Sequence, residues 1–148
     1  VNAANAGAVA VEMKHAYSKL SFLATAGNGY TGAANLTQVQ ITGGIYATGT
    51  LDMVAGTVDP AGTATGTLTL AAGEKALVVP TDDQPTIAVT CTIDGEEFTT
   101  SITADTMPSL LAGVEYEITL TVIGQEAVIS SVKEVPWTTT EVNGGTIY

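Results

Sequence analysis

Acidic side chains are the residues of this sequence whose spacing could support catalysis. They recur in pairs, as Asp82-Asp83, Glu96-Glu97 and Glu115/Glu117, and glycoside hydrolysis needs two carboxyl groups that flank the scissile bond. Glu115 and Glu117 alternate with apolar residues, as on the polar face of a strand, and the other pairs lie at predicted turns. We therefore interpret the pairs as solvated surface charges. A weak Ca²⁺ site around Asp94 and the neighbouring glutamates is the alternative.

The other reactive side chains occur singly. His15 is the only histidine and Cys91 the only cysteine, which excludes a multi-histidine site, a thiolate metal site and an intrachain disulfide. His15 stands among apolar residues and is interpreted as a hydrogen-bonded structural histidine rather than a general base. Cys91 lies in an alternating apolar run and is interpreted as a small buried hydrophobe. We predict no catalytic residue, no cofactor and no bound metal.

Two further features have a structural and a functional interpretation. Gly27, Gly29 and Gly32 match the dinucleotide fingerprint, but that fingerprint needs a helix after the glycines to bind pyrophosphate. The residues that follow Gly32 alternate like a strand, so we interpret the segment as a connection between strands. Trp137 could stack on a sugar ring, but we favour a tryptophan that closes one end of a sandwich.

Composition excludes several classes of protein. The chain has 148 residues, of which 45% are hydrophobic and 13% charged, so it is expected to collapse around a core rather than stay disordered. Its net charge is −11, with four lysines and no arginine, so nucleic acid and anionic membranes are repelled. No apolar stretch reaches the roughly 20 residues that a membrane span requires, and we predict no membrane insertion by this segment.

The elements that must position these residues are mostly strands. Ala8–Ala24 fits a strand with a phase slip after Tyr17 and also fits a helical stripe, and the strand is preferred because the rest of the chain carries no comparable helical stretch. Alternation over 37–41 and 45–53 predicts two strands that pair through Gly43-Gly44. Residues 55–66 read as a long surface loop, and 107–113 as a crossover that could hold one helical turn.

Two hairpins are predicted from turn chemistry. Asp94-Gly95 suits a type I′ turn and would place Cys91 opposite Phe98. Gly124-Gln125 suits a type II′ turn and would place Leu120 opposite Ile129. With the other strands, they predict an all-β fold: an antiparallel two-sheet β-sandwich of about 8–9 strands. We expect one domain over residues 1–148, with a flexible segment at 1–7 and an extended tail at 138–148.

Several segments resemble fimbrillin-like proteins of Bacteroides-type bacteria. The run from Val9 to Phe22, with its His and Ser-Lys-Leu, resembles the segment that opens their second domain. The likeness continues through 36–52, through Leu111–Val122 with its Ala-Gly-x-x-Tyr pattern, and to the closing Val135-Pro136-Trp137. Together these segments cover most of the chain.

This resemblance implies a transthyretin-like sandwich and a role as a subunit or accessory component of surface pili. In the family the precursor is an exported, outer-membrane lipoprotein of two sandwich domains, and polymerisation involves strand exchange after proteolytic trimming. The first domain, the lipid-bearing cysteine and the arginine cleavage site have no counterpart here. We therefore expect a C-terminal domain or processed fragment at the cell surface.

The open edges of such a sandwich can pair with a strand from another subunit. The predicted donor is Thr138–Tyr148, with Val142, Ile147 and Tyr148 as anchors. Other pilus subunits are then the expected partners. The alternative is an adhesin domain that binds host carbohydrate or matrix proteins, with Trp137 as the stacking platform.

Overall fold

The computed structural model describes residues 14–137, and every regular element in that range is a strand. The ten strands are β1 (Ser18–Ala26), β2 (Leu36–Ile45), β3 (Thr48–Asp52), β4 (Thr57–Ala61), β5 (Gly66–Ala71), β6 (Ala76–Val78), β7 (Ile87–Ile93), β8 (Glu96–Ile102), β9 (Val114–Ile123) and β10 (Glu126–Pro136). The all-β prediction is confirmed, with one or two more strands than expected. The predicted segments at 1–7 and 138–148 lie outside the described residues.

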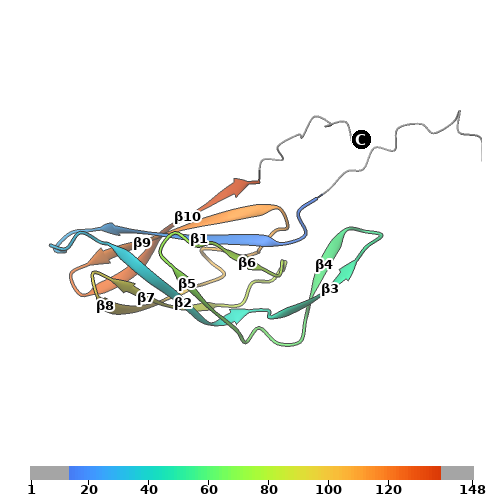
Figure 1. Ribbon diagram of the computed structural model, residues 1–148, viewed down its shortest axis with the longest axis horizontal. Coiled ribbons are helices and arrows are strands. Elements are labelled where there is room, and N and C mark those ends of the chain that lie inside the picture. Colours follow the sequence, from blue (N-terminus) through green and yellow to red (C-terminus); the bar gives the residue numbers. More distant parts are fainter. Residues whose placement is uncertain (1–13, 138–148) are drawn as a thin grey trace, which may run out of the picture.

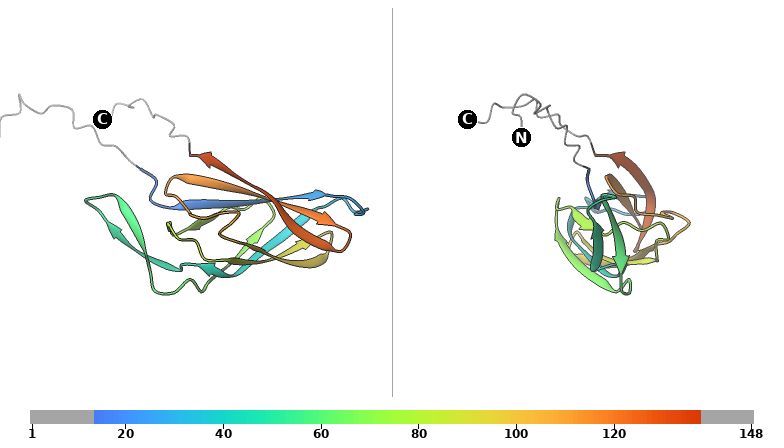
Figure 2. Two further views of the ribbon diagram at one scale, coloured as in Figure 1. Left: turned by 180° about the vertical axis from the view of Figure 1, so that it is seen from behind. Right: turned by 90° about the vertical axis from the view of Figure 1, so that its right-hand side faces the viewer.

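Eight of these strands form two sheets that pack face to face (Figures 1 and 2). One sheet has the order β10-β9-β1-β6 and the other β5-β2-β7-β8. Inward-facing residues of both sheets form one hydrophobic core, among them Leu20, Ile41, Val89, Ile118 and Leu120. Their period-two spacing puts all of them on inner faces, so the predicted sandwich is confirmed.

One pair of strands is parallel, which corrects the expectation of a purely antiparallel fold. β1 runs alongside β9 in parallel register, from Lys19 opposite Glu115 to Ala26 opposite Val122. Leu20 and Phe22 of β1 point into the core. Alternation predicted which face of β1 is buried, but it carries no information about the direction of the neighbouring strand.

Both predicted hairpins are confirmed with their registers. At the β7–β8 turn, Asp94 and Gly95 have φ values of 52° and 85°, the two positive values that a type I′ turn requires. Cys91 lies opposite Phe98 and is fully buried. At the β9–β10 turn Gly124 has a φ of 61°, and Leu120 lies opposite Ile129.

The predicted hairpin through Gly43-Gly44 is wrong. β2 continues through both glycines to Ile45, with irregular register on both of its neighbours. Gly44 has a φ of 90°, so the glycine accommodates a bulge inside the strand rather than a reversal of the chain. β3 pairs instead with β4, which lies within the predicted loop at 55–66. These two strands form a hairpin that projects from one end of the sandwich (Figure 1).

The crossover between β8 and β9 is also corrected. Within 107–113 the chain forms no helical turn, and Leu110 exchanges two backbone hydrogen bonds with Thr81, at 2.9 and 2.8 Å. Pro108 removes a backbone donor at that point, and Pro80 fixes the backbone just before Thr81. An isolated bridge satisfies the polar backbone where neither a helix nor a long ladder can form.

Candidate functional site

Trp137 lies where the described chain leaves the sandwich, beside the point where it enters. Its backbone N–H donates to the carbonyl of Gly113, with a distance of 3.0 Å. The His15 ring meets the indole edge-on, with ring centroids 4.0 Å apart, and the Lys19 Nζ lies 4.4 Å from the indole centroid. These contacts, with Glu115 and Lys75, define what we call the terminal cluster. The Trp137 side chain is half-buried, and its sugar-stacking role stays a prediction.

Glu115 is the electrostatic centre of the terminal cluster. Its side chain leaves β9 on the outward face of the sheet, yet the residue is only 6% exposed. The Nζ atoms of Lys75 and Lys19 lie 2.5 and 3.0 Å from its two carboxylate oxygens. Burial raises the pKa of Glu115, but hydrogen bonds from Lys75, Lys19 and Ser21 outweigh it and lower the pKa to about 2. The group is therefore a fixed anion and no proton donor near neutral pH.

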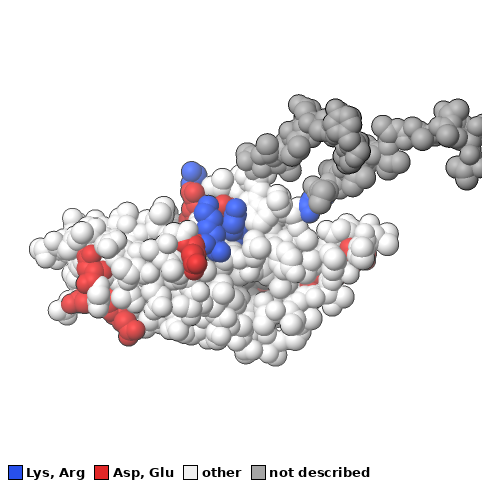
Figure 3. All heavy atoms as spheres, viewed as in Figure 1, with Lys and Arg blue, Asp and Glu red and all other residues white. Residues whose placement is uncertain are grey.

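Lysines gather beside carboxylates on the outer face of the β10-β9-β1-β6 sheet, whereas one end of the sandwich shows carboxylates without lysines (Figure 3). Lys133 extends this face and lies 3.8 Å from Glu117. At the β7–β8 turn, Asp94 accepts hydrogen bonds from the Tyr30 hydroxyl and from the backbone N–H groups of Ala34 and Asn35. Both oxygens of its carboxylate therefore accept hydrogen bonds from the protein. Within residues 14–137, no group of three or more metal-ligating side chains occurs.

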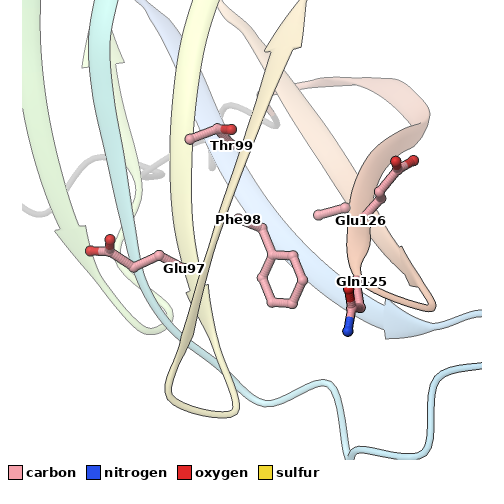
Figure 4. A pocket seen from close by; sticks show the side chains of 6 residues that line it. Glu97, Phe98, Thr99, Gln125 and Glu126 are labelled. Atoms are coloured by element: carbon pink, nitrogen blue, oxygen red, sulfur yellow. The ribbon is translucent and has the colours of Figure 1, made fainter.

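The remaining acidic pairs do not converge on a substrate site. A cavity of about 360 Å³ lies between the edge strands β8 and β10, and Glu97 and Glu126 contribute to its lining. Figure 4 shows that these two side chains point away from one another, with Phe98 between the two strands. General acid–base hydrolysis needs both carboxyl groups directed at one bond, so this cavity does not have that arrangement.

Sheet edges offer a different kind of site, and three of the four are guarded in ways that natural sandwiches use against unwanted pairing. β10 has a register shift between Ile129 and Ser131 and carries Lys133. β8 opens with Glu96-Glu97, and β6 is only three residues long. β5, with the sequence Gly-Thr-Leu-Thr-Leu-Ala, is six residues long and has neither charge nor proline. It is the unguarded edge among the described strands.

The open side of the sandwich extends from β5 to part of β1. β6 covers β1 only from Ser18 to Leu20, so in the described chain the residues 21–26 of β1 lack a neighbour on that side. Unpaired N–H and C=O groups in an extended segment can accept a further strand. The sequence carried a signal for this edge, since Gly66–Ala71 lacks every guarding residue. No comparable pattern in the sequence indicates that Lys19 and Lys75 pair with Glu115.

The structure describes the positions of some of the predicted site residues but not of others. Trp137 lies in the terminal cluster, His15 contributes a ring contact to it, and Cys91 is buried in the core. Gly27, Gly29 and Gly32 connect β1 to β2, and a strand rather than a helix follows them. The predicted anchors Val142, Ile147 and Tyr148 lie outside the described residues. No helix in the described range is long and apolar enough to cross a membrane.

The fold and these surfaces define a β-sandwich module with open edges. Its fold is similar to that of a proposed cell adhesion protein from Bacteroides uniformis ATCC 8492, with a TM-score of 0.69 and 23% identity over 84% of this chain and 52% of that one. A proposed cell adhesion protein from Bacteroides ovatus ATCC 8483 gives a TM-score of 0.61 and 18% identity over 84% of this chain and 46% of that one. The chain thus spans about half the length of either structure.

A family model described as fimbrillin-like matches residues 1–137. The chain therefore belongs to the fimbrillin-like family, as the sequence resemblance indicated. That family comprises structural and adhesion proteins rather than enzymes, so the chain is not an enzyme. A search of curated proteins finds no match.

Proposed function

We propose that this chain is a structural module of bacterial surface fimbriae, as a subunit or accessory component, and that it joins its neighbours by β-strand addition at β5. Family membership supports the pilus- or adhesion-related role. The unguarded β5 edge is the observation that carries the mechanism. The two four-stranded sheets share one core, which supports treating the chain as a single domain. The expected location is the cell surface, with outer-membrane attachment in the full-length precursor.

Strand addition suits the chemistry of this edge. A donor strand supplies the backbone hydrogen bonds that β5 lacks on its outer side, and alternate donor side chains fix the register. β5 offers a half-buried Leu68 between exposed Thr67 and Thr69, so a donor with aliphatic anchors fits it. The proposed donor is the tail Thr138–Tyr148 of a neighbouring subunit, with Val142, Ile147 and Tyr148 as anchors.

The test uses a truncated chain that ends at Trp137 together with a synthetic peptide of residues 138–148. We expect the peptide to bind the truncated chain, and Thr67→Lys with Thr69→Lys to weaken binding by at least tenfold, because lysines on an edge oppose strand pairing. The matched control is Thr99→Lys with Ser101→Lys on β8, two positions that are also exposed. Equal loss in both variants, or no binding together with unchanged assembly of the parent protein after truncation, rejects the mechanism.

The alternative role is adhesion to host carbohydrate or matrix proteins through Trp137. Its half-buried indole at the surface favours this role, but Lys19 occupies a position over the ring. A glycan array distinguishes the two proposals. Saturable hits that disappear in Trp137→Ala support adhesion, whereas an assembly module gives no saturable hit.

A further inference from the structure

The first and the last strand of the β10-β9-β1-β6 sheet meet the chain ends at one end of the sandwich. Lys19, near the start of β1, lies opposite Glu115 of β9. Pro136, at the end of β10, lies opposite Val114 of β9. Figures 1 and 2 show the start of β1 and the end of β10 on the same side of the molecule. The described chain therefore enters and leaves the fold beside the start of β9.

This arrangement decides how the sheet responds when its two ends are pulled apart. β9 lies between β10 and β1, and β10 pairs with no other strand among residues 14–137. The hydrogen bonds of an antiparallel ladder are perpendicular to its strands. A pull on the end of β10, directed away from β9, therefore loads the last bond of the ladder first and opens the others one at a time. Contacts at the strand end then set the resistance.

Gly113 joins the entry of the chain directly to its exit. Its N–H donates to the carbonyl of Tyr17 at 2.9 Å, and its carbonyl accepts from the N–H of Trp137 at 3.0 Å. The buried hydroxyl of Ser18 donates to the carbonyl of Leu111 at 2.7 Å. A φ of 75° places Gly113 in the left-handed region that suits glycine. Three segments are thus tied together beside the ends of both strands.

Side chains of the terminal cluster strengthen this tie. The His15 ring and the Lys19 ammonium group, which both come from the entry of the chain, contact the indole of Trp137 at the exit. Lys19 is also held at 3.0 Å by Glu115 of β9. Aromatic pairs and cation–π contacts stabilise beyond the area that they bury. The end of β10 is therefore bound to β1 as well as to β9.

The rest of β10 is held less firmly. Ala127 is the only fully buried residue among its 11 positions, and its register shifts between Ile129 and Ser131. Lys133 lies 3.8 Å from Glu117, and its side chain is 73% exposed, so that ion pair contributes little. Once the end of β10 is released, few contacts oppose its further separation from β9.

We propose that the terminal cluster is a mechanical lock, which keeps β10 on the sheet while the chain is under tension. A subunit of a surface fibre is pulled through the segments that leave its fold, and only this need for a lock rests on the proposed function. The lock itself is a property of residues 15–137. It requires no second subunit and no strand addition at β5.

Constant-force spectroscopy of single full-length chains tests the lock. With handles at the two chain termini, Trp137→Ala is expected to shorten the lifetime of the folded state about tenfold, since lost contacts that break before the transition state speed unfolding. The second geometry places handles at Glu96→Cys and Gln125→Cys, at the other end of β8 and β10. There the same substitution is expected to change the lifetime less than twofold. Native Cys91 is 0% exposed and takes no handle.

His15→Ala provides a second variant that leaves the core intact, because His15 is exposed. Its expected effect is a lifetime about threefold shorter with terminal handles and unchanged in the second geometry. Equal shortening in both geometries would identify a general stabiliser and overturn the lock, and so would unchanged lifetimes of both variants with terminal handles. Each molecule is measured alone, so a failure of strand addition in the peptide-binding test leaves these results unaffected.

Discussion

Glu115 shows how one buried anion organises the outer face of a sheet. Two lysines from different strands or loops converge on it, and one of them also lies over Trp137. The carboxylate therefore links β9, β1 and the β5–β6 connection near the point where the described chain ends. No pattern in the sequence reveals this, because Lys75 and Glu115 are brought together only by the tertiary fold, 40 residues apart.

Replacing Glu115 by Gln is expected to lower the free energy of unfolding at neutral pH by about 1–3 kcal/mol, since both ammonium groups lose a charged acceptor. The lowered pKa of Glu115, about 2 against the ordinary 4.5, stabilises the native state above pH 4.5. That contribution is lost as the pH falls toward 2. Urea titrations of both proteins across this range should converge at low pH. Glu117→Gln is the control, and a loss below about 1 kcal/mol is expected because its partner Lys133 is exposed.

Tyr30 and Asp94 form the second coupled pair. The hydrogen bond that the hydroxyl donates to Asp94 raises the pKa of Tyr30 to about 12. The same contact lowers the pKa of Asp94. A raised pKa in the folded state means that this contribution to stability is present below pH 10 and is lost as the pH rises to about 12.

Spectrophotometric titration of tyrosinate checks this pair. One tyrosine of the native protein is expected to ionise near pH 12. In the Asp94→Asn variant, the pKa of that tyrosine should return to about 10. Asn tolerates the left-handed backbone at this turn position, so the hairpin should keep its fold. A tyrosine that still ionises near 12 in the variant would assign the shift to another cause.

At the scale of elements, period-two alternation predicted which face of a strand is buried, but it did not reliably predict which strand lies beside it. It identified the inward residues of β7, β8, β9 and β10, and turn chemistry then fixed the pairing of these neighbouring strands. It failed at β2 and β3, since a Gly-Gly pair is equally compatible with a hairpin turn and with a bulge. The β5 edge was readable from composition, but its position at the open side of a sheet needed the topology.

Gly44 gives a sharp test of that bulge. A Cβ at this position would collide with the backbone of Thr86 and Ile87, and the φ of 90° is disfavoured for any other residue. Gly44→Ala is therefore expected to destabilise the protein by about 3 kcal/mol or more. Gly43→Ala is the matched control, because a Cβ there meets nothing within 4 Å. Urea unfolding of both variants measures the difference, and similar losses at 43 and 44 would contradict the bulge geometry.

At the scale of the whole molecule, the β3–β4 hairpin (residues 48–61, here called the arm) and the sandwich are separable parts. None of the arm's residues belongs to the main core cluster, and within residues 14–137 the arm pairs with no strand outside itself. Replacement of residues 48–61 by a short Gly-Ser connection should leave the sandwich folded.

The expected change in unfolding free energy for this replacement is within about 2 kcal/mol, which corresponds to the lost burial of Val58. Far-UV circular dichroism and thermal melting measure it. A cooperative transition close to that of the intact chain is the expected result. Loss of the transition would mean that the arm is an integral part of the core.

The parallel pairing of β1 with β9 has a consequence for synthesis. Thr25 and Thr121 touch through their hydroxyl groups although they stand 96 residues apart in the chain. At a ribosomal rate of about 5–20 residues per second, roughly 5–20 s pass between the translation of Thr25 in β1 and that of Thr121 in β9. The nascent chain therefore lacks the complete β10-β9-β1-β6 sheet until β9 has been translated. A chain in that state is the form that can be threaded through a narrow protein-conducting channel before it folds.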